Sequence, residues 1–113
     1  LGDLADRGML DRTLVAILGD FGRTPKINAN AGRDHWNFCY SIMLAGGGIR
    51  PGWVHGASDR GGAYPADAPT SPADILAPIY RLLGADHRMQ LYDRFQRPHQ
   101  IVSRGNVVPD LLA

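Results

Sequence analysis

Residues 13–19 read TLVAILG, an unbroken apolar run that is rich in β-favouring side chains. An apolar run without polar alternation is typical of a strand that is covered on both faces, as in a parallel sheet. A second run, CYSIMLA at residues 39–45, has the same character and ends at the three glycines of residues 46–48. We therefore predict two buried strands, with a short third strand over residues 52–56.

Residues 71–83 carry the strongest helix signal in the chain. Ser71 is a good N-cap, Pro72 suits the first helical position, and Asp74 follows three residues after the cap, near the positive end of the helix dipole. Pro78 removes one helical hydrogen bond, so we expect a kink there. The predicted buried face consists of the apolar residues at helical spacing, Ile75, Leu76, Ile79, Leu82 and Leu83.

Two weaker helical patterns complete the predicted elements. Residues 1–10 place apolar side chains at helical spacing, and residues 89–95 are compatible with a short helix. Helix, buried strand, long polar loop, buried strand and helix is an α/β order. In such folds, sites gather in loops beyond the carboxyl ends of strands, which directs attention to residues 20–38.

Composition limits the classes of protein to which the chain can belong. It has 113 residues, is 44% hydrophobic and has a formal net charge of +1, so a folded domain is expected and a dedicated nucleic-acid binder is not. No apolar run approaches the roughly 20 residues that cross a bilayer. Cys39 is the single cysteine, which excludes an internal disulfide. The chain opens with Leu1 and shows no signal peptide, so we interpret it as the C-terminal portion of a longer protein.

The first candidate site segment is GDFGRTP, residues 19–25. Asp20 stands at the end of the predicted first strand, and its carboxylate suits a divalent cation. The planar fork of Arg23 suits a phosphate, sulfate or carboxylate group. The alternative is local: Asp20 caps the following turn and pairs with Arg23.

The second segment is GRDHW, residues 32–36. Histidine is the commonest protein ligand of metals, and a neighbouring carboxylate can orient its ring. His35 and Asp20 therefore have the chemistry to share one ion. Two ligands do not make a catalytic zinc site, which usually has three. The alternative is a loop histidine packed beside Trp36.

The remaining motifs are read as structural. Residues 58–65 are interpreted as a surface loop, and the glycines of residues 46–48 lack the Lys-Ser/Thr of a phosphate-binding loop. Cys39 is expected to be a buried small residue rather than a nucleophile. The other histidines have no partner at metal-ligand spacing and are interpreted as structural or surface residues: His55, His87 and His99.

Three motifs together resemble one family. GDFGRTPKIN at residues 19–28, GRDHW at residues 32–36 and AGGGI at residues 45–49 resemble the bacterial proteins grouped as domain of unknown function 1501. These proteins are sulfatase-like and related to the alkaline phosphatase superfamily. The likeness covers nearly the whole chain, because it continues through GASD at residues 56–59, AYPAD at residues 63–67 and the helix that ends at Gly84.

The resemblance implies a three-layer α/β/α fold with a mostly parallel sheet, of which residues 1–113 would be the C-terminal part of a single domain. Superfamily members hydrolyse phosphate or sulfate esters at a metal site, with a nucleophile in the earlier part of the domain. Asp20 matches the Asp of an Asp-His ligand pair, but Phe21 occupies the His position and cannot bind metal. His35 matches a later metal-binding histidine.

The implied function is metal-dependent hydrolysis of a small-molecule or glycan ester of sulfate or phosphate. Asp20 and His35 would hold a divalent ion, which could be Zn, Ca, Mg or Mn. Arg23 or Arg33 would contact the anionic ester, and Asp34 would orient His35 from behind. The residues present would lack the nucleophile, so this portion alone is expected to be inactive.

A second hypothesis follows from the phenylalanine at a ligand position. The scaffold would then be retained without hydrolysis, and it would bind an anionic glycan or a protein partner. A third hypothesis is a small α/β domain with no site. Relatives usually carry an export signal, so the resemblance implies a periplasmic or secreted protein.

Overall fold

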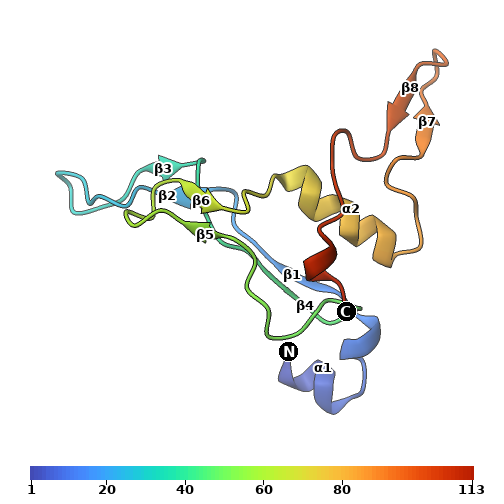
Figure 1. Cartoon of the computed structure of the whole chain (residues 1–113), viewed down its shortest axis with the longest axis horizontal. Helices are drawn as coiled ribbons and strands as arrows, with labels where there is room; N and C mark the ends of the chain where they lie inside the picture. Colours follow the sequence, from blue (N-terminus) through green and yellow to red (C-terminus); the bar gives the residue numbers. More distant parts are fainter.

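The strands of this chain form separate two-stranded antiparallel sheets. The computed structural model describes all residues, 1–113 (Figure 1). Its helices are α1 (Gly2–Asp6) and α2 (Pro72–Leu82), with short 3-10 turns η1 (Leu10–Arg12) and η2 (Pro109–Leu111). Its strands are β1 (Val15–Ile17), β2 (Gly22–Arg23), β3 (His35–Trp36), β4 (Met43–Ala45), β5 (Ala57–Ser58), β6 (Pro65–Asp67), β7 (Gln90–Tyr92) and β8 (Pro98–Gln100).

The predicted mostly parallel sheet of a three-layer α/β/α fold is wrong for this chain. β1 pairs with β4 in antiparallel register, with Val15 opposite Ala45 and Ile17 opposite Met43. The other pairs, β2 with β3, β5 with β6 and β7 with β8, are also antiparallel. A parallel pair needs a long crossover connection, usually a helix. The connection from β1 to β4 contains only the β2–β3 hairpin, so the chain returns in the opposite direction.

Several predicted elements are shorter than expected or of another type. The first helix is limited to α1, and the chain turns at Gly8 with a φ of +64°. Of the second predicted strand, residues 39–45, only β4 forms a strand. The strand predicted over residues 52–56 is not formed, and the strand that follows β4 in the chain is β5. The helix predicted over residues 89–95 is also wrong, since β7 lies there.

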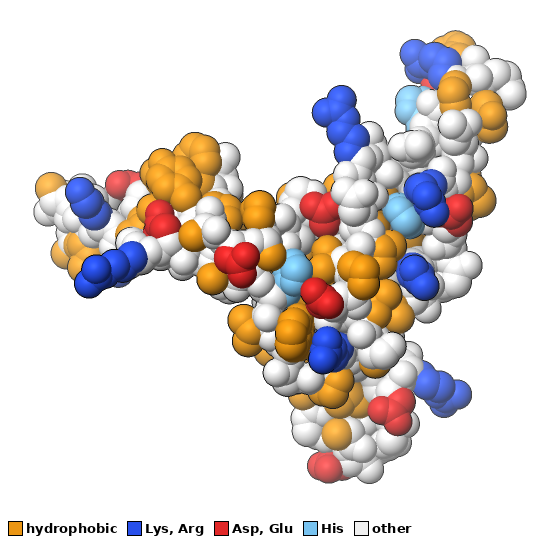
Figure 2. Space-filling model, in the orientation of Figure 1, with side chains coloured by type: hydrophobic (Ala, Val, Ile, Leu, Met, Phe, Trp, Pro, Cys, Tyr) orange, Lys and Arg blue, Asp and Glu red, His pale blue; other side chains and the backbone are white.

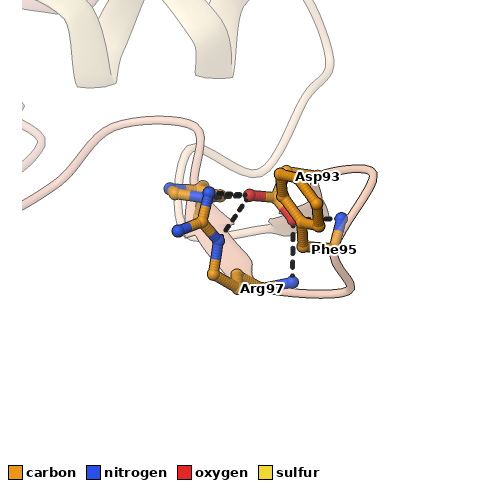
Figure 3. Close-up of polar contacts among 4 residues, drawn as sticks. Asp93, Phe95 and Arg97 are labelled. Carbon is orange, nitrogen blue, oxygen red and sulfur yellow. Dashed lines mark hydrogen bonds and ion pairs between the residues drawn. The ribbon is translucent and has the colours of Figure 1, made fainter.

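Asp93 explains why the chain forms a hairpin between β7 and β8 instead of a helix (Figure 3). Its carboxylate accepts the backbone N–H groups of Phe95 at 2.8 Å and Arg97 at 3.0 Å. The same carboxylate accepts the Nε–H of Arg97 at 2.7 Å and lies 3.4 Å from the His99 ring. These donors, led by the backbone N–H of Arg97, lower the pKa of Asp93. An aspartate that bonds the following backbone in this way favours a turn over a helix.

The predicted helix over residues 71–83 is confirmed as α2. Ser71 caps it, and Asp74 completes a capping box by accepting the Ser71 backbone N–H at 2.9 Å. The predicted buried face is only partly right, because Leu76 and Leu83 are 46% and 75% exposed. Ala77 and Pro78 are buried instead. Helical spacing locates an apolar face, whereas the segments that pack against the helix decide which residues are covered.

The chain is open and branched rather than compact (Figure 1). Its radius of gyration is 17.1 Å, against about 13 Å for a compact domain of this length. Its accessible surface is 8513 Å², against about 6,100 Å² for a compact protein of this mass. Hydrophobic side chains are exposed on each branch (Figure 2). Five residues are buried: Gly22, Ala77, Pro78, His87 and Val102.

The prediction that the first strand is covered on both faces is therefore wrong. Ile17 and Leu18 are 53% and 60% exposed. Apart from the paired strands and the α1–η1 turn, the elements make few contacts with one another. Neither α1 nor α2 has the length and the apolar character that a membrane-spanning helix requires.

Candidate functional site

The β2–β3 arm is defined as residues 20–36. It carries all five candidate site residues predicted from the sequence, which are Asp20, Arg23, Arg33, Asp34 and His35. Gly22 lies opposite Trp36, and Arg23 lies opposite His35. Directly opposed residues of an antiparallel pair project their side chains from the same face. Gly22 permits this pairing, because a Cβ atom there would lie 2.8 Å from the Trp36 carbonyl oxygen. The hairpin thus brings Arg23 and His35 to one face.

Phe21 connects these two side chains. Its ring centroid lies 4.1 Å from that of His35, with the planes tilted by 43°. The Arg23 guanidinium carbon lies 5.3 Å from the Phe21 centroid, within the range of a cation–π contact. Phe21, His35 and Arg23 therefore form one cluster, which we call the 21/23/35 cluster. The sequence placed Phe21 at a ligand position but did not predict its contact with His35.

Asp20 precedes Phe21 in the chain and is exposed. Its Oδ1 accepts the backbone N–H of Phe21 at 2.9 Å, which is the local capping role that the sequence also allowed. None of the ion pairs of the chain joins Asp20 to Arg23. The second carboxylate oxygen of Asp20 has no hydrogen bond and is free to bind an ion or a donor.

Arg33 lies in the loop between β2 and β3. Its Nη1 donates to the carbonyl oxygens of Thr24 at 2.9 Å and Pro25 at 3.0 Å. These two hydrogen bonds help to close the loop. The other N–H groups of the guanidinium make no hydrogen bond within the chain. Anion binding by Arg33 stays a prediction.

Asp34 also holds this loop together. Its Oδ1 accepts the side-chain Nδ2–H of Asn28 at 2.9 Å. Asn28 in turn uses its own Oδ1 to accept the backbone N–H groups of Asn30 and Gly32, each at 3.0 Å. No hydrogen bond joins Asp34 to His35, so orientation of the ring by Asp34 stays a prediction.

A metal ion fits this set of side chains only in part. Asp20 offers an oxygen donor and His35 a nitrogen donor, both of which divalent metals accept. No three His, Cys, Asp or Glu side chains of the chain gather at a distance that holds an ion. A catalytic metal on this arm would need at least one ligand beyond these two.

An aromatic cluster that the sequence analysis missed borders the arm. The ring centroids of Trp36, Phe38 and Tyr64 lie 4.9–5.5 Å from one another. The indole N–H of Trp36 donates to the Ala63 carbonyl oxygen at 2.6 Å. Asp59 shapes this loop by accepting the Ala63 backbone N–H at 2.8 Å. The predicted surface loop over residues 58–65 is thus the β5–β6 hairpin connection, docked on β3. The sequence signal that could have predicted this cluster is the presence of Trp36 and Phe38 at the end of one polar loop and of Tyr64 in the other.

The family described as Protein of unknown function (DUF1501) matches residues 1–112, so the chain belongs to that family. No curated protein and no solved structure matches the chain. The family predicted from the motifs is confirmed, and the wider kinship to sulfatases stays a prediction.

Proposed function

Starting from membership of this family, we propose that the chain is part of a metal-dependent hydrolase of sulfate or phosphate esters. The observation that carries the proposal is the 21/23/35 cluster, which Asp20 directly precedes in the chain. A guanidinium and an imidazole lie on one face of a short hairpin, and the residue before it, Asp20, has a carboxylate oxygen without a hydrogen bond. This combination suits an anionic ester and a divalent ion better than any other group of side chains in the arm.

The roles follow from the chemistry of each side chain. Asp20 and His35 would hold the metal together with a ligand from outside this pair. A bound divalent ion would polarise the ester and stabilise charge on the leaving oxygen. Arg23, which makes no ion pair, would bind the anionic oxygens through its planar fork.

We assign no nucleophile to the β2–β3 arm. Thr24 is its only hydroxyl, and the loop already uses that group. The Thr24 Oγ1 donates to the Lys26 carbonyl oxygen at 2.9 Å and accepts the Asp34 backbone N–H at 3.0 Å. A hydroxyl held in this way is a structural group, so the proposed arm binds and orients the ester.

A second candidate function is binding of an anionic glycan or a protein partner without hydrolysis. The contact of Phe21 with the His35 ring favours it, because one face of the imidazole is then occupied by an apolar ring. The absence of a third close ligand also favours it. Arg23 would bind the anion in this case as well, so metal content separates the two candidates.

The test is elemental mass spectrometry of the full-length protein after incubation with zinc, calcium, magnesium and manganese. We expect a bound ion that falls in both Asp20→Ala and His35→Ala and is retained in His99→Ala. His99 is the matched control, because it is an exposed histidine on the β7–β8 hairpin. Wild-type protein without metal would contradict the hydrolase and favour the second candidate.

Turnover provides the second readout of the same protein. With p-nitrophenyl sulfate and p-nitrophenyl phosphate, we expect metal-dependent hydrolysis of one of them. Arg23→Gln should raise KM about tenfold, because a charge-assisted bond contributes roughly 1.5–3 kcal/mol. Activity that is unchanged after chelation of the metal would also refute the proposal.

A further inference from the structure

A cavity of about 390 Å³ lies at the C-terminal end of α2. Its volume falls within the range of small-molecule sites, roughly 300–1,000 Å³. Arg81, Asp86, His87, Arg88 and Asn106 supply its polar groups. None of its lining residues belongs to the β2–β3 arm, which lies on another branch of the molecule (Figure 1).

His87 is the buried polar group of this cavity. The residue is 8% exposed, and its side chain is 10% exposed. Its ring makes no hydrogen bond within the chain, because the nearest carboxylate oxygen, Asp86 Oδ1, lies 3.8 Å from Nδ1. No fully buried side-chain nitrogen or oxygen lacks a partner. The unbonded ring nitrogens therefore reach solvent, and His87 is one of the residues that line the cavity.

The backbone holds this histidine in place. The His87 carbonyl oxygen accepts the Val102 N–H at 3.0 Å. The backbone N–H of Asn106, another lining residue, donates to Asp74 at 2.8 Å, which ties that segment to α2. The His87 segment is therefore bonded to Val102, and the Asn106 segment is bonded to α2 through Asp74.

The charges around the cavity favour an anion. Arg81 makes no ion pair, and the Arg88 Nε lies 3.8 Å from Asp86 Oδ1. That Asp86 oxygen already accepts the Arg88 backbone N–H at 2.9 Å. The end of α2 adds partial negative charge. Two guanidinium groups against one carboxylate still leave an excess of positive charge.

We propose that this cavity binds a small hydroxylated molecule that carries a phosphate group. Arg81 and Arg88 would bind the phosphate oxygens, as guanidinium forks do. His87 would bond a hydroxyl group through its ring nitrogens. Asn106 would do so through its side-chain oxygen, since its Nδ2 also donates to Asp74 at 3.5 Å. The cavity is several times larger than a bare oxyanion, and only Ala85 and Val107 give it hydrophobic lining. A hydroxylated group of about the size of a sugar, attached to the phosphate, would fill the cavity.

The test is titration of the full-length protein with glucose 6-phosphate, glucose and inorganic phosphate, followed by calorimetry and by NMR of the histidine ring protons. We expect glucose 6-phosphate to bind and to shift the His87 ring signals. Inorganic phosphate should bind at least tenfold more weakly, and glucose should not bind. Equal binding of inorganic phosphate would overturn the proposed hydroxylated body, and failure of glucose 6-phosphate to bind would overturn the whole proposal.

Exposed arginines provide matched variants that do not disturb the buried residues. Arg81→Gln should weaken glucose 6-phosphate binding about tenfold, as expected for loss of a charge-assisted bond. Arg94→Gln, on the β7–β8 hairpin and outside the cavity, should leave it unchanged. Arg23→Gln should leave the shift of the His87 ring signals unchanged, which separates this cavity from the proposed ester site. Binding that depends on Arg23 and not on Arg81 would refute the assignment.

Discussion

The helix α2 and the β1–β4 pair are the two most apolar regions of this chain, and they differ in how much they bury. Four of the five buried residues belong to α2 or to the segment after it: Ala77, Pro78, His87 and Val102. The β1–β4 pair buries no residue, and Ile17 and Met43 remain 53% and 44% exposed. An apolar sequence therefore led to a small core in one region and to an uncovered surface in the other.

The difference lies in where the contacts come from. A helix satisfies its backbone hydrogen bonds within itself, and α2 adds its own cap at Ser71. The following chain then returns over it, with the Asn106 N–H bonded to Asp74. A two-stranded hairpin is at best marginally stable unless a further strand or a helix covers it. Nothing in the chain provides that cover for β1 and β4.

Among the predictions for stability, the greatest loss of unfolding free energy is expected from a substitution in the turn beside the β1–β4 pair. Gly46 has a φ of +69°, and a Cβ atom there would collide with the carbonyl oxygens of Leu10 and Thr13. Gly46→Ala should therefore lower the free energy of unfolding by about 3 kcal/mol, from overpacking and the left-handed backbone together. Urea unfolding of the full-length protein measures this change.

Gly52 is the matched control for that substitution. Its φ is +65°, but nothing lies within 4 Å of the position of a Cβ atom. Gly52→Ala should cost only the conformational part, about 1 kcal/mol. Equal losses in the two variants would show that the close approach at Gly46 does not matter.

A smaller effect is expected in the core beside α2. Val102 is 4% exposed, whereas Val54 is 83% exposed. Val102→Ala should cost about 1.6 kcal/mol, since each buried methylene contributes roughly 0.8 kcal/mol. Val54→Ala should cost almost nothing. Thermal unfolding of both variants checks the contrast, and a loss at Val54 as large as that at Val102 would mean that other surface covers Val54.

The smallest effect concerns the pH dependence of α2. The Ser71 hydroxyl, bonded at 2.6 Å, is the main cause that lowers the pKa of Asp74 below 3.8, and the backbone N–H groups of Asn106 and Ser71 add to it. A lowered carboxyl pKa stabilises the fold above the unfolded value, and this contribution is lost as the pH falls through the folded pKa. Stability should therefore decline below about pH 4.

Two variants sharpen this prediction. Asp74→Asn should remove its share of the acid dependence, and Ser71→Ala should remove part of it. Unfolding followed by circular dichroism between pH 2 and 6 gives the slopes. A wild-type slope that Asp74→Asn leaves unaltered would contradict the role of this carboxylate.

Some features of the candidate site could be predicted from the sequence and others could not. Asp20, Arg23 and His35 are recognisable as chemistry-bearing residues because their motifs lie between two apolar runs. The approach of the Phe21 ring to His35 was not predictable, because it depends on the register of β2 against β3. His87 was interpreted as a structural or surface residue, since the cavity that it lines includes segments about 20 residues apart in sequence.

The family, the helix α2 with its cap and its Gly84 stop, and the positions of β1 and β4 could all be predicted from the sequence. These features depend on local signals, which are capping groups, glycines and runs of apolar residues. The tertiary structure alone decided that β1 and β4 are antiparallel, that Ala77 rather than Leu76 is buried, and that Arg81, His87 and Asn106 meet at one cavity. Each of these depends on which distant segments come into contact, and no local pattern encodes that choice.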